Sequence, residues 1–331
     1  MTRTGYPPPG TPADAQLATH NVTRLSVGVA IVLIALKAFA LGASGSVSIL
    51  ASLLDSTLDL VASLVTFVAV RWAAGPADER HRFGRGKGEA LAALIQSGLI
   101  FASAVFVGWE ALQRILDPRP ITAGVWGVSV ILISIVLTLG LVWMQTRAIK
   151  RSQSMAVTAD RAHYTADLAA SVVVLIGVAS GAFLQAPGLD AAAGLVVSVW
   201  LFWGALGLVR TAADHLLDRA VSDADRITIT TAVLSDPRIS GVHQLRTRMA
   251  GPVLMIQMHI DMDPGLTLKA AHDIIVEAEN RLLVAFPAAD ILIHPDPRGQ
   301  AGAVDTCAAD GDAEPEPDPE LTQKGAAGPW S

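Results

Sequence analysis

Two pairs of potential metal ligands stand four residues apart within apolar stretches of this chain. Asp55 and Asp59 lie in SILASLLDSTLDLVASLVTFVAV, and His163 and Asp167 lie in RAHYTADLAA. Residues at i and i+4 of a helix share one face, about 6 Å apart along the axis. Two such helices side by side could place three carboxylates and one imidazole around a single point. This four-coordinate set suits zinc and is tolerable for iron, cobalt, manganese or cadmium.

Carboxylates are costly in an apolar span. Each aspartate costs about 2.5 to 3.5 kcal/mol at the centre of a membrane helix on insertion scales, so a compensating cation is expected. A structural ion pair with Lys37 is the alternative explanation. Because ionisable residues inside a membrane are functional by default, and because His163 and Asp167 repeat the spacing, the pattern favours a bound metal ion.

The composition indicates a membrane protein. Hydrophobic residues make up 52% of the 331 residues, and charged residues make up 16%, compared with about 25% in soluble proteins. The mean hydropathy is +0.47. The net charge of −6 provides no basic excess for nucleic acid, so no nucleic-acid partner is expected. The single cysteine, Cys307, excludes an intrachain disulfide and a cysteine-based metal cage.

Six apolar runs reach the length of about 20 residues that a helix needs to cross a lipid bilayer. The expected spans are 22–43, 47–72, 90–116, 121–148, 162–185 and 189–211. Lys and Arg concentrate in the second-to-third and fourth-to-fifth loops and are absent from the first-to-second and fifth-to-sixth loops. The positive-inside rule therefore predicts that the basic loops and both termini are cytoplasmic.

The composition changes after the sixth span. A helical pattern over 222–235, two β-type runs, a helical pattern over 266–286 and the run DILIHPD predict a small αββαβ domain. We expect a disordered lead over 1–20 and a six-helix transmembrane domain over 21–212. A cytoplasmic α+β domain is expected over 213–298, and a disordered acidic tail over 299–331.

These features together resemble the cation diffusion facilitator family, especially its bacterial zinc and ferrous-iron efflux members. The resemblance covers about residues 25–298 and includes DSTLD, HYTAD, PADERHRFGRGKGEALAAL, LLDRAVSD and IHPDP. It implies a metallochaperone-like cytoplasmic domain and a homodimeric antiporter of the bacterial inner membrane. The antiporter would export a divalent cation, above all zinc, in exchange for protons. The implied transport site consists of Asp55, Asp59, His163 and Asp167.

The resemblance also implies metal sites outside the membrane. A binuclear zinc cluster at the dimer interface, which would strengthen the dimer or sense cytoplasmic metal, is matched by His243, His259, His272, His294 and Asp296. Asp296 is the expected bridging ligand.

Two other matches lie near the membrane border. Asp78 and His81 match two ligands of a peripheral metal site, but Arg85 stands at the third position. A guanidinium cannot coordinate a cation, so this site is expected to be absent or weakened unless Glu79 substitutes. Lys87 and Asp218 match a charge pair that joins the third span to the cytoplasmic domain.

Three other functions fit the sequence less well. A membrane metalloenzyme would need a base beside an open metal position, as in HExxH, which the sequence lacks. An intramembrane aspartyl protease would carry its two carboxylates on different helices, whereas Asp55 and Asp59 share one. A membrane-anchored metal sensor or scaffold needs no buried charge in its spans. The sequence therefore predicts a secondary transporter rather than an enzyme.

Overall fold

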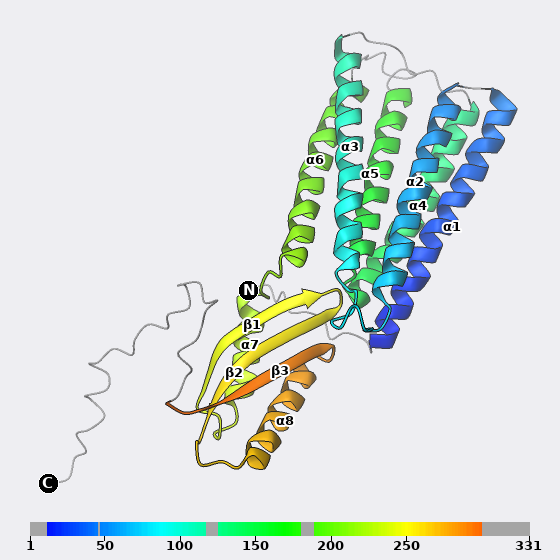
Figure 1. Ribbon diagram of the computed structural model, residues 1–331. Helices are drawn as coiled ribbons and strands as arrows, with labels where there is room; N and C mark the ends of the chain where they lie inside the picture. Colours follow the sequence, from blue (N-terminus) through cyan, green and yellow to red (C-terminus); the bar gives the residue numbers. More distant parts are fainter. Residues whose placement is uncertain (1–11, 46, 117–124, 180–188, 300–331) are drawn as a thin grey trace.

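A six-helix bundle and a smaller α+β unit make up the chain. The computed structural model describes residues 12–45, 47–116, 125–179 and 189–299. The bundle consists of α1 (Pro12–Ser44), α2 (Val47–Ala73), α3 (Gly88–Leu116), α4 (Val125–Ser152), α5 (Met155–Ala179) and α6 (Leu189–Leu216). The α+β unit consists of α7 (Asp223–Leu234), β1 (Gly241–Ala250), β2 (Val253–Met262), α8 (Leu268–Ala285) and β3 (Ala289–Pro297) (Figure 1). The predicted fold class is confirmed.

All six helices of the bundle are long and apolar enough to cross a membrane. Large apolar side chains such as Phe39, Phe106, Val136 and Trp203 are exposed on the bundle surface, as lipid contact requires. Helix α5 lies in the middle and contacts each of the other five helices (Figure 1). Its side chains can therefore meet those of every span.

Two helices begin earlier than the sequence predicted. Helix α1 begins at Pro12, within the expected disordered lead, and α5 begins at Met155 rather than at residue 162. A search for apolar runs misses these added turns because they are polar. At the start of α1, Pro12 is a residue that is favoured in a first helical turn. At α5, the Ser154 hydroxyl accepts from the Val157 N–H at 3.3 Å and donates to the Glu89 carboxylate at 2.6 Å. Residues 1–11 and the expected acidic tail beyond residue 299 lie outside the described residues.

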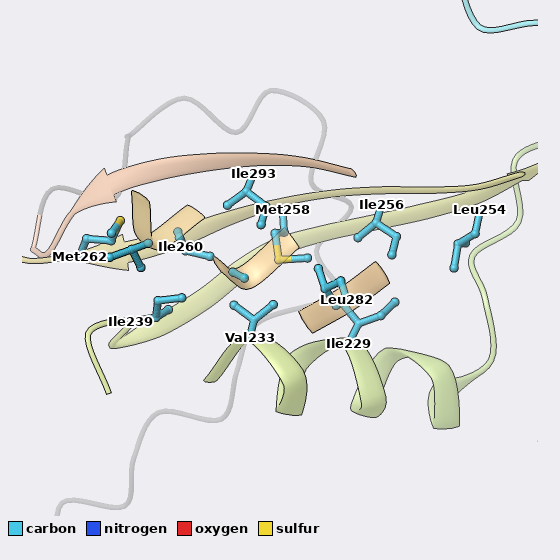
Figure 2. Close-up of a cluster of buried hydrophobic side chains, with 12 residues drawn as sticks. Ile229, Val233, Ile239, Leu254, Ile256, Met258, Ile260, Met262, Leu282 and Ile293 are labelled. Carbon is cyan, nitrogen blue, oxygen red and sulfur yellow. The ribbon is translucent and has the colours of Figure 1, made fainter. Parts of the chain in front are cut away.

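The α+β unit is a three-stranded sheet in the order β1-β2-β3. Strand β1 is antiparallel to β2, and β2 is parallel to β3. Ile256, Met258 and Ile260 of β2 pack against apolar side chains of α7 and α8, which cover one face of the sheet (Figure 2). Because side chains alternate along a strand, His259 and Asp261 lie on the opposite face. None of the described helices of the α+β unit covers that face.

The bundle and the α+β unit meet where the α2–α3 loop touches the β1–β2 turn. A Cβ atom on Gly86 would lie 2.8 Å from the backbone nitrogen of Gly251, and closer still to the carbonyl group of Ala250. Gly251 also has a φ of +65°, in the left-handed region that favours glycine. The two backbones touch directly, and neither position has room for a side chain.

Charged side chains cross the same contact. Lys87 Nζ lies 2.8 Å from Asp218 Oδ1, and Arg248 Nη1 lies 3.2 Å from Asp218 Oδ2. The Arg248 guanidinium also lies over the Phe83 ring, 5.2 Å from its centroid. Burial acts to raise the pKa of Asp218, but the hydrogen bonds and charges of Lys87 and Arg248 outweigh it and hold the pKa below its ordinary value.

We expect Gly86→Ala to destabilise the full-length protein by about 1 to 3 kcal/mol, because the added methyl group must displace the backbone of the β1–β2 turn. Thermal unfolding and hydrogen exchange of this turn measure the effect. Gly98→Ala in α3 is the control, since its Cβ would meet nothing within 4 Å. A Gly86→Ala protein with the same unfolding temperature and the same exchange rates as the wild type would contradict the tight contact.

The ion pairs of Asp218 predict a pH dependence. Because its pKa is lowered in the folded chain, the ion pairs stabilise the contact above the ordinary aspartate value of about 3.9 and are lost as the pH falls toward the lowered pKa. We expect Asp218→Asn to accelerate hydrogen exchange at the β1–β2 turn at neutral pH. The difference from wild type should shrink as the pH falls below about 4. A difference that does not change with pH would contradict this assignment.

Candidate metal centres

Three of the four predicted transport ligands meet between α2 and α5. His163 Nε2 lies 3.2 Å from Asp59 Oδ1 and 3.6 Å from Asp167 Oδ2. One ligand atom from each of these three residues lies within 4.8 Å of the others. Asp59 and His163 are both only 5% exposed, within a bundle of otherwise apolar helices. The structure therefore provides a group of two carboxylates and one imidazole, in which Asp59 and His163 are buried and Asp167 is partly buried.

The spacing of these atoms fits a tetrahedral metal ion. Zinc binds nitrogen and oxygen ligands at about 2.0 to 2.1 Å, and a tetrahedron of that radius has edges of about 3.3 Å. The separations of 3.2 Å and 3.6 Å from His163 Nε2 bracket this length. The third edge, between the Asp59 and Asp167 oxygens, is at most 4.8 Å, so the three side chains lie close enough together to converge on one ion.

Asp55 is the predicted ligand that lies outside this group. It stands one turn before Asp59 on the same face of α2, and its side chain is exposed. It is close enough to interact electrostatically with Lys37, Asp59 and His163. A rotation of α2 or of the side chain would be needed to bring Asp55 to the ion.

Lys37 of α1 does not form the ion pair that was the alternative to metal binding. Its Nζ atom donates to the Ser52 carbonyl oxygen at 3.0 Å and to the Ser56 hydroxyl at 2.5 Å. The ammonium is nevertheless near enough to interact with the charges of Asp55, Asp59 and Asp167. A positive charge therefore stands beside the carboxylates, while its hydrogen bonds to Ser52 and Ser56 lead to serine oxygens instead.

A second group of ligands lies on the open face of the sheet. Strand register places His243 opposite His259, and His259 opposite His294, so one histidine from each strand falls in a single row. Asp261 and Asp296 face each other in the neighbouring row. The β1 strand has an irregularity directly after His243, where Gln244 has a φ of 50°. A β-bulge of this kind re-aims the side chains beside it.

The Asp296 carboxylate lies close to all three histidines of this row. Its Oδ2 atom lies 2.8 Å from His259 Nδ1 and 3.2 Å from His243 Nε2, whereas its Oδ1 atom lies 3.4 Å from His294 Nε2. Burial acts to raise the pKa of Asp296, but the hydrogen bond from His259 and the charges of the three histidines outweigh it and lower the pKa. The two oxygens of one carboxylate thus face different histidines. His243 also approaches Asp261 Oδ2 at 3.5 Å.

His272, the fifth predicted ligand of this cluster, lies elsewhere in the unit. It belongs to α8, on the covered side of the sheet, and its side chain is exposed. It is not part of the group formed by His243, His259 and Asp296. Within one chain, the structure does not bring His272 to the other ligands.

The α2–α3 loop pairs Asp78 with Arg85. The Arg85 guanidinium hydrogen-bonds Asp78 Oδ2 and donates from Nε to His81 Nδ1 at 3.4 Å. Asp78 Oδ1 accepts from the backbone N–H groups of His81 and Arg80 at 2.7 Å and 2.9 Å, and these bonds, the former above all, lower the pKa of Asp78. Glu79 is not part of a metal-ligand group among the described residues. The arginine therefore occupies the place between the two remaining ligands.

Two residues at these sites were missed by sequence reasoning. Asp160 lies three residues before His163 and therefore on the same face of α5, a spacing that the sequence shows. Arg248 hydrogen-bonds Asp218 across the domain contact. No sequence pattern near Arg248 indicates this, because the contact depends on how β1 packs against the α2–α3 loop.

Two family models match the chain. The model of the cation efflux transmembrane domain matches residues 23–217, and that of the cytoplasmic domain of cation efflux proteins matches residues 221–298. The cation-efflux pump FieF of Klebsiella pneumoniae subsp. pneumoniae is 41% identical over 274 residues, which are 82% of this chain and 90% of the pump. FieF of Pectobacterium carotovorum subsp. carotovorum is 42% identical over 275 residues, with the same two coverages of 82% and 90%.

A solved structure also resembles part of the chain. The metal-bound C-terminal domain of the CzcD transporter from Thermotoga maritima is 22% identical and aligns with a TM-score of 0.22. The match covers 25% of this chain and 100% of that domain.

We expect His259→Asn to weaken zinc binding to the α+β unit of the full-length protein by at least about tenfold, because it removes the imidazole nearest to Asp296. Zinc bound per chain after equilibrium dialysis provides the measurement. Gln257→Ala is the matched control, since Gln257 precedes His259 by two residues on the same strand and is exposed. Equal zinc content in wild type and His259→Asn would exclude this cluster as a metal site.

Proposed function

The chain belongs to the family of cation-efflux transporters, and we propose that it exports a divalent transition-metal ion from the cytoplasm in exchange for protons. It is a multi-pass membrane transporter, not an enzyme. The observation that carries the proposal is the buried group of Asp59, His163 and Asp167 within the spans. Asp55 would complete the ligand set after a local movement.

Zinc is the substrate that this ligand set favours. Two or three carboxylates with one imidazole suit a tetrahedral zinc ion, and the ligand separations match a zinc tetrahedron. Ferrous iron, cadmium, cobalt and manganese also accept nitrogen and oxygen ligands, so the metal series must be compared directly. A site without thiolate should release its ion readily, as transport requires.

Proton coupling follows from the chemistry of the same ligands. Carboxylate and imidazole must be deprotonated to bind metal, so metal and protons compete for one set of atoms. When the site faces the two sides of the membrane alternately, inward-moving protons drive the metal outward. Each elementary charge that crosses 100 mV contributes about 2.3 kcal/mol.

The α+β unit is proposed to bind resident zinc and to join two chains. Asp296 can bridge two ions because Oδ2 faces His243 and His259 while Oδ1 faces His294. The cluster lies on the uncovered face of the sheet, where a second copy could pack. His272 would contribute only through such an assembly or a rearrangement of α8. Zinc bound there would strengthen the homodimer or report cytoplasmic metal.

The proposed location is the bacterial inner membrane, with both termini in the cytoplasm. The basic α2–α3 loop and the last turn of α4, which carries Lys150 and Arg151, lie at the end of the bundle that carries the α+β unit (Figure 1). The positive-inside rule places that end in the cytoplasm. Metal from the cytoplasm would then enter the bundle from the side of the cytoplasmic cluster.

We expect Asp59→Asn to reduce metal-driven proton flux to the background of empty liposomes, because it removes an anionic ligand from the buried group. The measurement uses reconstituted full-length protein, a pH-sensitive dye inside the vesicles, and zinc, ferrous iron, manganese and cadmium in turn. Asp290→Asn is the control, since Asp290 is an exposed carboxylate of β3.

Two results would contradict the proposal. Undiminished proton flux in Asp59→Asn would show that the buried group is not the transport site. A wild-type protein that binds metal but moves neither metal nor protons would instead be a membrane-anchored sensor or scaffold.

A further inference from the structure

A buried carboxylate lies one helical turn from the transport ligands and outside their group. Asp160 of α5 is 0% exposed. None of the ion pairs found among the described residues involves Asp160, although the nearby His163 pairs with both Asp59 and Asp167. An ionised carboxylate in such a place carries a large desolvation cost, which no direct ion pair among the described residues offsets.

The hydrogen bonds around Asp160 lack one donor. Gln145 of α4 donates from Nε2 to Asp160 Oδ2 at 2.8 Å and to the Ser26 hydroxyl oxygen of α1 at 3.1 Å. Asp160 Oδ1 and Gln145 Oε1 are both buried and have no partner. Ser26 also hydrogen-bonds the Asp160 carboxyl group, but its single hydroxyl proton is shared with the Val22 carbonyl oxygen, which lies 3.2 Å away.

A single proton on Asp160 would satisfy both unpartnered oxygens. The neutral acid would donate from Oδ1 to Gln145 Oε1, while Gln145 Nε2 continues to donate to Oδ2. Acid and amide would then be joined by two antiparallel hydrogen bonds. Leaving two buried acceptors without donors is unfavourable, so the arrangement favours the protonated state.

Charged groups of the transport site also face Asp160. The charged groups are His163 of α5 and Asp59 of α2, and the neutral Tyr164 of α5 also lies near. Among the described residues, α1 and α4 contribute the uncharged Ser26 and Gln145. His163 lies three residues further on, about 4.5 Å along the helix axis. A metal dication bound there would act on Asp160 through a medium of low dielectric constant and favour its ionised form.

We propose that Asp160 is a proton-binding site, separate from the metal ligands, that releases its proton when the metal binds. In the step, the Oδ1–H bond breaks, the proton passes to water, and the nearby dication compensates the new carboxylate charge. Asp160 lies in the second turn of α5, toward the end of the bundle next to the α+β unit (Figure 1). The inference rests on the proton-coupled exchange proposed above.

Infrared difference spectroscopy of the full-length protein tests the proton directly, without transport. We expect a carboxylic-acid carbonyl band at neutral pH that disappears on addition of zinc and is missing from Asp160→Asn. The asparagine amide can donate to Gln145 Oε1, so this variant should fold. Glu89→Gln is the matched control, because Glu89 is also buried but accepts from Ser154 and from the backbone of Ala156 and Met155.

If Asp160→Asn does not fold, Gln145→Met provides the second test. It removes the hydrogen-bond partner and leaves the carboxyl group in place, so the carbonyl band should shift. A wild-type protein without a zinc-sensitive acid band, or a band that Gln145→Met leaves in place, would overturn the assignment to Asp160.

Flux measurements separate this inference from the antiport proposal. We expect Asp160→Asn to retain metal transport with a lower ratio of proton flux to zinc flux, and Glu89→Gln to keep the wild-type ratio. An unchanged ratio in Asp160→Asn would overturn the role of Asp160 while antiport stands. A zinc-sensitive band in a wild type that moves no protons would instead refute antiport and leave the proton site in place.

Discussion

The cost of burying charge in an apolar bundle is the constraint on which this structure depends. Asp59, His163 and Asp167 are held together between α2 and α5, and each needs the others or a cation to offset its loss of hydration. The Lys37 ammonium adds a fixed positive charge to the same region. Helix α5 touches all five other spans, so protein surrounds the polar side chains that it carries.

The α+β unit positions side chains of the same types, histidine and aspartate, by strand pairing instead of burial in a membrane. Its histidines do not need a membrane to exclude water, because strand pairing alone aligns His243, His259 and His294 in one row. Helices α7 and α8 bury the apolar residues of the opposite face and make the sheet a firm support (Figure 2). The backbone contact of Gly86 with Gly251 joins this support to the loop between α2 and α3. Movements of the two parts are therefore tied at one point close to the transport helices.

Patterns that are local in sequence were sufficient for most of the fold. Apolar runs gave the six spans, and periodicity gave the αββαβ order of the second unit. The polar first turns of α1 and α5 were missed because hydropathy does not register them. Contacts between helices were harder to predict from the sequence. The i, i+4 spacing within each helix indicated Asp59, His163 and Asp167, but it could not show that Asp55 stays outside their group. The bond of Arg248 to Asp218 and the separation of His272 from Asp296 depend on strand and helix packing, which no local pattern specifies.

In the α2–α3 loop, the positive charge beside Asp78 and His81 is the Arg85 side chain rather than a bound metal ion. Its guanidinium lies between Asp78 and His81 and 5.7 Å from the centroid of the Trp72 ring. A cation attached by covalent bonds has a local concentration set by the loop, so neither chelators nor scarcity of metal can remove it. The loop can thus keep its shape in a metal-starved cell and in a metal-poisoned one alike. If the histidine row of the sheet binds zinc as proposed, the metal concentration at which it responds would be independent of the stability of the loop.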